Sequence, residues 1–451
     1  MTTTEKDPLL ARQLTDAEVD YVFAHLGQFI EADEPLQSII AWPRTAGGLR
    51  MDVRVQGVPV LFPMSAVDEG WAEESKDAPW EETPEGVLVR HDLVKSAFYL
   101  LSAYQEWASA AVDEWGRFPY EESVQYKLGM EHVAVVNHYF RWMTEAVVRQ
   151  CELRKISYRE KSPLGGPSLH LSHDVDLAHY FTLRKSLYRC AQVVGLRRCD
   201  TSRRRLLGAA VRSLLHMARI VSYKDPYWSF DDIQDNEAFI GHKSEWFFLP
   251  RDGGPFPPDY DFRTDADIRE LISTLAHRGN TVSLHAPINC QKAADYAKWR
   301  QALGEVCPEA SAHTRQHFLA IHPWASFRAM EEAGLTTDFT FGFSHSEGFR
   351  NGYCHPFHPF DHDRQRTMRL TCVPLAMMDV SCLTHKKMTY DEVFLAVGDM
   401  LDEVRAFGGV FSLLWHNSTF DEVYHPGIGK FYEQLHLLFS QYQLKGFGGL
   451  S

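Results

Sequence analysis

Two aspartates that lie two positions apart carry the clearest chemistry in the sequence. Asp174 and Asp176 end the stretch SLHLSHDVD, whose alternating apolar residues from Ser168 onward are typical of a β-strand. Side chains at positions i and i+2 of an extended chain point the same way, so both carboxylates are expected to face one side. Two such carboxylates repel each other, and a bound cation relieves this repulsion while one of them remains able to accept protons.

Two histidines and an asparagine extend this pattern. His285 closes the strand-like run TVSLH, Asn289 follows it by four residues, and His416 ends the last apolar run, GGVFSLLWH. In an α/β barrel, functional side chains gather at the carboxyl ends of the strands. Each of these patterns alone is weak, but their occurrence at three strand ends in this order predicts a metal-dependent active site.

Helices alternate with strands throughout the second part of the chain. Helix-to-strand units are expected at 266–287, 326–343 and 391–417, and Gly279 stands where a helix C-cap is expected. This alternation predicts an α/β fold with a parallel sheet, open or closed into a barrel. The turn-rich segment KSPLGGPS separates this part, residues 165–451, from an expected N-terminal α+β domain, residues 1–160, with amphipathic helices at 91–115 and 131–152.

The charge is distributed unevenly. The formal net charge is −14, which argues against general nucleic-acid binding, yet residues 184–224 contain eleven Lys and Arg against one acid, Asp200. This basic segment runs into LLGAAVRSLLHMARIV, which has helical apolar spacing, so it predicts a basic helical insertion. Two interpretations stay open: a solvated helical face, or a patch for substrate phosphates or for an anionic membrane surface.

The motifs resemble those of the NodB-homology polysaccharide deacetylases, specifically a subgroup with an HDVD motif and an extra N-terminal domain. The resemblance covers the chain from about residue 165 to its end, and VRHDLVKSAFYLLSAYQEW and GRFPY look like the companion domain. It implies a distorted (β/α) barrel, a divalent metal ion with zinc as first choice, and hydrolysis of an N-acetyl amide on a sugar or glycan.

The resemblance also implies roles for individual residues. Asp174 would be the catalytic base, and Asp176 and His285 would be metal ligands. Asn289 occupies the position of a second metal-binding histidine, and because an amide oxygen is neutral, a weaker zinc site is expected. Arg315 in TRQHF would pair with the base, although the usual prolines of this motif are missing. A backbone N–H near Phe318 would stabilise the oxyanion. His416 in LWH would be the general acid.

Two further residues have competing interpretations. Arg350, in GFRNGYCHPFHPFD, would bind a substrate carboxylate or phosphate, or else form a structural salt bridge. Asp379, in VPLAMMDV, would support an active-site arginine or histidine, or else be a buried acid satisfied by capping.

The expected substrate is an N-acetylated sugar, a glycan or a nucleotide-linked or lipid-linked precursor in surface polysaccharide biosynthesis. Two other functions remain open: a degenerate barrel that only binds glycans, and a DxD metal-dependent glycosyltransferase, which would leave His285 and His416 unexplained. The first residues, MTTTEKDPLLARQL, contain no apolar run behind a positive stretch, and the eight cysteines form no CxxC pair. A cytoplasmic protein is therefore expected.

Overall fold

A curled sheet of parallel strands forms the centre of the computed structural model, which describes residues 6–64, 74–198 and 201–448. Eight strands follow the order β15-β12-β11-β10-β9-β8-β17-β16, and β18 pairs with β8 beside them. Every pairing within this sheet is parallel. The strands are β8 (Ser168–Val175), β9 (Ser244–Phe248), β10 (Thr281–Ala286), β11 (His313–Gln316), β12 (Thr337–Asp338), β15 (Thr371–Cys372), β16 (Met377–Met378), β17 (Val410–Leu414) and β18 (Lys445–Gly446).

A short stretch of chain connects the two edge strands of the sheet. β15 and β16 are joined by residues 373–376, in which the Val373 N–H donates to the Asp338 carbonyl and the Ala376 N–H donates to the Ser412 carbonyl. The sheet is therefore a distorted (β/α) barrel, as the sequence predicted. All eight residues of β8 and all five of β17 are buried, since helices cover the outer face of the barrel.

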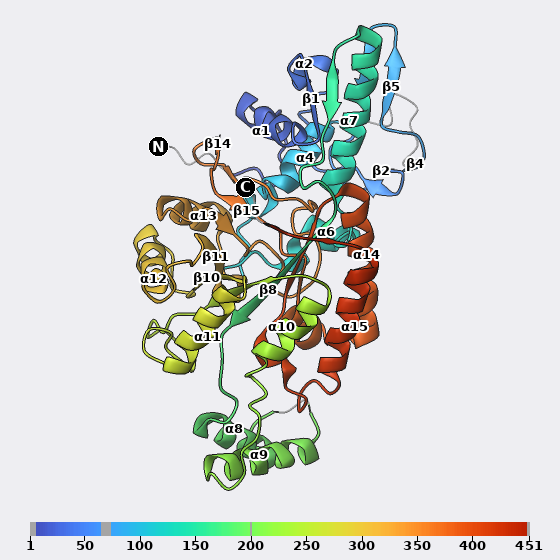
Figure 1. Ribbon diagram of the computed structural model, residues 1–451. Helices are drawn as coiled ribbons and strands as arrows, with labels where there is room; N and C mark the ends of the chain where they lie inside the picture. The colour runs from blue at the N-terminus through green and yellow to red at the C-terminus, as the bar shows by residue number, and fades with distance from the viewer. Residues whose placement is uncertain (1–5, 65–73, 199–200, 449–451) are drawn as a thin grey trace.

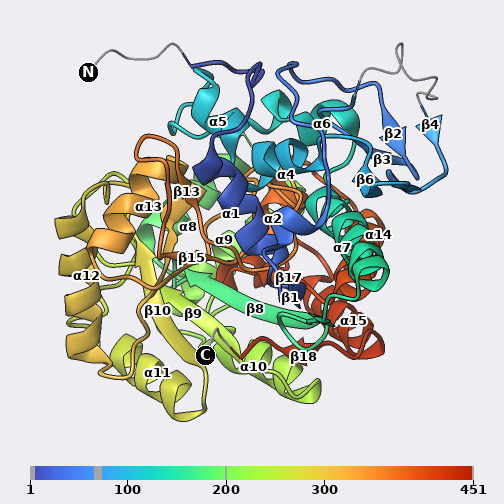
Figure 2. The same ribbon diagram turned by 90° about the horizontal axis from the view of Figure 1, so that it is seen from above.

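The covering helices lie around the strands when the molecule is seen from above (Figure 2). They begin and end where the local sequence dictates: a Thr389–Glu392 capping box starts α14, and Gly279 adopts φ +83° after α11, as expected for a C-cap glycine. These helices are α10 (Phe230–Phe239), α11 (Ala266–His277), α12 (Ala293–Val306), α13 (Pro323–Glu332), α14 (Tyr390–Phe407) and α15 (Ile428–Gln441).

Residues 6–64 and 74–160, here called the N-terminal region, pack against one side of the barrel (Figure 1). The expected helix at 91–115 is interrupted by the left-handed residue Ala103, which divides it into two. The helices of this region are α1 (Asp16–Leu26), α2 (Leu36–Ile39), α4 (Leu93–Leu101), α5 (Tyr104–Ala108), α6 (Val124–Leu128) and α7 (Val135–Arg154). Its strands are β1 (Ile30–Ala32), β2 (Arg54–Val55), β3 (Val58–Pro59), β4 (Glu74–Ser75), β5 (Trp80–Thr83), β6 (Gly86–Val89) and β7 (Tyr158–Glu160).

The segment that contains GFRNGYCHPFHPFD joins the N-terminal region to the barrel. The backbone N–H of Phe349 donates to the Glu131 carbonyl, and the Val136 N–H donates to the Gly352 carbonyl. Gly348 has φ +121°, and a Cβ at this position would lie 2.5 Å from the Glu131 oxygen, so only glycine fits. Arg350 follows directly and forms a buried ion pair with Glu106 of α5, with Nη2–Oε2 2.6 Å and Nε–Oε1 2.8 Å.

Breaking this ion pair is expected to destabilise the protein strongly. Both side chains are at most 4% exposed, so Glu106→Gln or Arg350→Met leaves one charge buried without its partner, at a cost of about 3–5 kcal/mol. Denaturant unfolding followed by fluorescence measures the change. The control is Arg149→Met, since Arg149 pairs with Glu82 on the surface, where the expected cost is below about 1 kcal/mol. Equal shifts for the buried and surface variants would contradict this prediction.

The basic segment forms two helices that project from the barrel at the end opposite the N-terminal region (Figure 1). α8 (Leu183–Val193) and α9 (Arg203–Met217) pack against each other after the carboxyl end of β8. We call residues 183–221 the hairpin. No helix within the described residues is both long and apolar enough to cross a membrane.

Candidate metal centre

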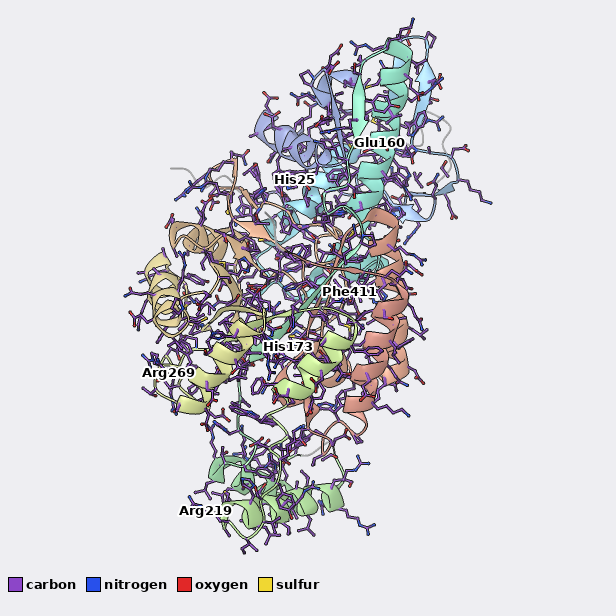
Figure 3. The ribbon with its side chains drawn as sticks, in the orientation of Figure 1. His25, Glu160, His173, Arg219, Arg269 and Phe411 are labelled. Carbon is purple, nitrogen blue, oxygen red and sulfur yellow. The ribbon has the colours of Figure 1, made fainter. Side chains whose placement is uncertain are left out.

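Polar side chains from four strands converge at the carboxyl end of the barrel. Parallel pairing brings the ends of β8, β10, β11 and β17 to one edge of the sheet. The residues gathered there are Asp174, Asp176, His285, Arg315, His317 and His416. Strand alternation separates His173 from this group. Its Nδ1 donates to the Trp415 carbonyl at 2.7 Å and its Nε2 lies 2.7 Å from Glu237 Oε1, so the ring is buried inside the molecule (Figure 3).

Asp176, His285 and His317 form a cluster that suits a metal ion. One donor atom from each of the three residues lies within 4.8 Å of the others. His285 Nε2 is 3.1 Å from Asp176 Oδ1, and His317 Nε2 is 3.7 Å from Asp176 Oδ2. One carboxylate and two imidazoles are the donor set of many catalytic zinc sites.

The tautomer of His285 supports this interpretation. Its Nδ1 lies 2.9 Å from the carbonyl oxygen of Arg315, which can only accept, so Nδ1 carries the proton. In the neutral ring, Nε2 then directs a lone pair at Asp176 Oδ1, and both atoms are buried without a hydrogen-bond partner. Two lone pairs facing each other are repulsive unless a cation lies between them, so these residues fit a metal ion. Burial would raise the pKa of Asp176, but the nearby His317 outweighs burial and holds that pKa well below its usual value.

Asp174 lies beside the cluster and is held by Arg315. Arg315 Nη1 donates to Asp174 Oδ1 at 2.8 Å, while its Nη2 donates to Ser172 Oγ and its Nε to the Phe339 carbonyl. The guanidinium is fully buried, so three fixed acceptors determine its position. The second oxygen of Asp174 is 3.5 Å from His285 Nε2. One oxygen is thus bound to a permanent cation and the other faces the cluster.

His416 lies beside the cluster and is oriented by Asp379. His416 Nδ1 lies 2.7 Å from Asp379 Oδ1, its backbone N–H donates to Oδ2, and Thr419 donates its hydroxyl to the same oxygen. His416 Nε2 is 3.7 Å from Asp176 Oδ2. Burial would lower the pKa of His416, but Asp379 and the carboxylates of Asp176 and Asp174 raise it to about 10. Burial alone would raise the pKa of Asp379, but the neighbouring His416 outweighs burial, so the pKa of Asp379 is lower than its usual value.

Aromatic residues form one wall above the cluster. Phe318 has a left-handed backbone, φ 60°, and stacks in parallel on Trp115 of the N-terminal region with centroids 5.0 Å apart. Arg117 holds this conformation by donating to the Phe318 carbonyl at 2.6 Å. A non-glycine residue in this region of backbone space is strained, and such strain is found at functional sites. Trp115 and Arg117 line a cavity of about 320 Å³ together with the cluster, so the N-terminal region supplies part of the site wall.

Two residues singled out from the sequence lie elsewhere. Arg350 forms the ion pair with Glu106, the structural alternative that the sequence left open. Asn289 is exposed and lines neither the cavity above the cluster nor the larger cavity beside it; its Nδ2 lies 2.7 Å from where a Cβ on Gly254 would be. Its role as a ligand stays a prediction, and His317 is an alternative third donor.

Sequence reasoning missed His317, although a signal was present. His317 follows Arg315 by two positions at the end of β11, the same spacing that identified Asp174 and Asp176. The backbone turns into a short 3-10 helix at His317–Leu319, and this turn directs the ring toward Asp176.

Replacing His317 is expected to weaken metal binding more than replacing Asn289. His317→Ala removes one of the three donors. Loss of a residue that only supports a metal ligand lowers metal affinity by about 10–100-fold, so loss of His317 itself should lower zinc affinity by more than this. Asn289→Ala should change the affinity by less than about threefold, within the usual context dependence of such effects. Competition with a chromophoric chelator measures both dissociation constants. A greater loss of zinc affinity for Asn289→Ala than for His317→Ala would identify Asn289, and not His317, as the third metal ligand.

Comparison with known proteins finds a matching family model and several similar solved structures. Residues 11–152 match a family model described as "Family of unknown function (DUF7033)". No curated protein sequence matches the chain. Among solved structures, a putative polysaccharide deacetylase from Mycobacterium smegmatis is 13% identical, with 63% of this chain and 95% of that chain covered and a TM-score of 0.37. The Bc1960 peptidoglycan N-acetylglucosamine deacetylase is 10% identical, with 63% and 87% covered and a TM-score of 0.31. The barrel assignment rests on the strand order and pairing described above.

Proposed function

We propose that this protein is a metal-dependent hydrolase that removes the N-acetyl group from a sugar or glycan. The observation that carries the proposal is the arrangement of three units around one point: the Asp176–His285–His317 cluster, the Asp174–Arg315 pair and the His416–Asp379 pair. They correspond to a cation site, a proton acceptor and a proton donor, which are the three components that amide hydrolysis requires.

The residues divide the chemistry between them. A divalent cation, zinc as first choice for this donor set, would polarise the acyl carbonyl and lower the pKa of a nearby water. Asp174 accepts the proton of the attacking water at the oxygen that faces the cluster, and Arg315 holds that carboxylate in place. His416 donates a proton to the departing nitrogen, since an amine is a poor leaving group until it is protonated. A backbone N–H near Phe318 would stabilise the oxyanion.

The substrate is proposed to be an N-acetylated sugar, a glycan or a nucleotide-linked or lipid-linked precursor used in surface polysaccharide biosynthesis. The stacked pair of Trp115 and Phe318 at the cavity wall supports a ring-shaped substrate, because sugar rings pack against aromatic faces. We place the reaction in the cytoplasm. The seven cysteines within the described residues are free and mostly buried, which is typical of a reducing compartment.

The test is release of acetate together with a free amine. Zinc-loaded protein is incubated with N-acetylglucosamine, its oligomers and UDP-N-acetylglucosamine, and both products are quantified, with Asp174→Asn as control. Equimolar acetate and amine, lost in the variant, are expected. Consumption of the nucleotide sugar with transfer would identify a glycosyltransferase instead. Glycan binding without either product, at full metal occupancy, would identify a binding protein and overturn the proposal.

A further inference from the structure

The hairpin exposes an unusual amount of apolar surface. Of the 21 large apolar side chains that are exposed among the described residues, ten lie in this segment of 39 residues. They are Leu183, Leu187, Tyr188, Val194, Leu196, Leu207, Val211, Leu214, Ile220 and Val221. Exposed apolar side chains are ordinary when scattered, but a concentration of this kind marks an interaction surface.

The exposed apolar residues follow the helical repeat. On α9, Leu207, Val211 and Leu214 are spaced i, i+4 and i+7 and are 46–53% exposed, so they form one stripe along the helix. This stripe is not the face that holds the hairpin together. Leu206 and Ala209 of α9 are fully buried and pack on Val423 of the barrel side. α9 therefore has a second apolar face with no partner among the described residues.

Basic residues border this stripe. At about 100° per residue, Arg203 and Arg204 lie roughly 40° and 60° from Leu207, one on each side of the stripe, and Arg205 lies on the far side of the helix. All three are exposed, and none pairs with a carboxylate within the described part of the chain. Figure 3 shows that the hairpin, which also carries Arg219, extends away from the barrel. An apolar stripe with arginines beside it is the pattern of a helix that lies in the interface of an anionic membrane.

A cavity connects the hairpin to the metal centre. It has a volume of about 950 Å³, and its lining includes Leu187, Tyr188, Arg184 and Arg197 of the hairpin. Asp176, His317 and Phe318 of the metal centre line the same cavity. Arg184 and Arg197 have no carboxylate partner among the described residues, so the cavity presents positive charge as well as apolar surface. A ligand with an anionic and an apolar part would complement both.

We propose that the hairpin docks this protein on the surface of an anionic lipid bilayer and thereby places the metal centre beside a substrate carried by a membrane lipid. The net charge of the whole protein, −14, makes the location of the docking surface specific, because an anionic bilayer repels the rest of the molecule and attracts the exposed basic residues of the hairpin, such as Arg203 and Arg204. The docking does not depend on the proposed function, whereas the lipid-borne substrate rests on it.

Flotation of the full-length, zinc-loaded protein with vesicles tests the docking. Vesicles of phosphatidylcholine with phosphatidylglycerol are compared with vesicles of phosphatidylcholine alone. Binding to the anionic vesicles only is expected, and it should weaken as salt screens the charges. Arg203→Gln/Arg204→Gln/Arg205→Gln should reduce binding by at least about 25-fold at low salt, since Arg203 and Arg204 beside the stripe each contribute about fivefold. Leu207→Gln/Val211→Gln/Leu214→Gln should reduce it by at least about tenfold.

The control variant changes exposed apolar residues elsewhere. Leu395 of α14 and Leu437 of α15 are 68% and 48% exposed, and Leu395→Gln/Leu437→Gln should bind vesicles as the wild type does. No binding by the wild type, or unchanged binding by both hairpin variants, overturns the proposal. A wild-type dimer in solution that becomes a monomer in the Leu207→Gln/Val211→Gln/Leu214→Gln variant would assign the stripe to self-association and also overturn it.

Kinetics separate the docking from the catalytic proposal. With an N-acetylated sugar attached to a lipid phosphate in anionic vesicles, the hairpin variants should raise KM with little change in kcat, whereas a water-soluble N-acetylated sugar should be turned over equally by all. Vesicle binding without any turnover contradicts the proposed function alone. Turnover with hairpin variants indistinguishable from wild type on both substrates contradicts the lipid-borne substrate alone.

Discussion

Asp174→Asn is expected to abolish turnover while the protein keeps its full complement of metal. Asp174 is held by Arg315 at 2.8 Å, and its other oxygen is 3.5 Å from His285 Nε2, so it lies beside the cluster rather than within the group of three donors. An amide cannot accept the proton of the attacking water. Loss of a general base costs about 10²–10⁴ in rate, and loss of the charge that Arg315 neutralises adds to it.

The matched variants Asp176→Asn and His285→Ala are expected to lose both metal and activity. Each removes a donor from the cluster, and Asp176 also provides the negative charge that attracts the cation. Metal content is measured by mass spectrometry after exhaustive dialysis, and turnover by acetate release with added zinc. Equal metal loss in Asp174→Asn, Asp176→Asn and His285→Ala would show that Asp174 is itself a ligand and would reverse the assignment of the base.

His416→Gln is expected to reduce turnover of an N-acetyl sugar by about 10²–10⁴, because the leaving amine loses its proton donor. Asp379 and the neighbouring carboxylates overcome burial and raise the pKa of His416 to about 10, which keeps the ring protonated at neutral pH. The ring is thus prepared to donate. Asp379→Asn should give a smaller loss, since the ring remains but its orientation and charge are less well maintained.

The choice of substrate makes this prediction specific to proton donation. A nitrophenyl acetate ester has a leaving group, nitrophenolate, that departs without protonation, so His416→Gln should lose less than about tenfold on this substrate. Rates with the amide and the activated substrate are compared for wild type and variant at equal metal content. A loss of the same size on both substrates would indicate that His416 binds the metal or the carbonyl, and would contradict its role as the acid.

The sequence patterns alone predicted a parallel α/β sheet and several of the residues at its carboxyl end, and the family resemblance added that the sheet forms a barrel. The periods of apolar residues are local properties, so β8, β10 and β17 could be recognised, and a parallel sheet then brings their ends together. Asp174, Asp176, His285 and His416 were found in this way, and Arg315 through the resemblance. The spacing could also have identified His317, but a single histidine after a short strand is not distinguished by pattern alone.

Contacts between distant segments could be decided only by the tertiary structure. Arg350 pairs with Glu106 across 244 positions of sequence, and no local pattern indicates which of several acids a buried arginine will meet. Asp379 and His416 come from different strands, and their pairing raises the pKa of the histidine through distance and burial. Trp115 reaches the site only because the N-terminal region packs on the barrel.

The hairpin shows the same division between local and tertiary information. The eleven basic residues and the helical spacing of 184–224 are evident in the sequence, but spacing cannot tell which apolar face of a helix becomes buried. In the folded chain Leu206 and Ala209 pack inward while Leu207, Val211 and Leu214 face outward. Sequence determined that the helix is amphipathic and basic, because these are properties of neighbouring residues. Tertiary packing decided which side is left exposed, because burial depends on the partners that the rest of the chain provides.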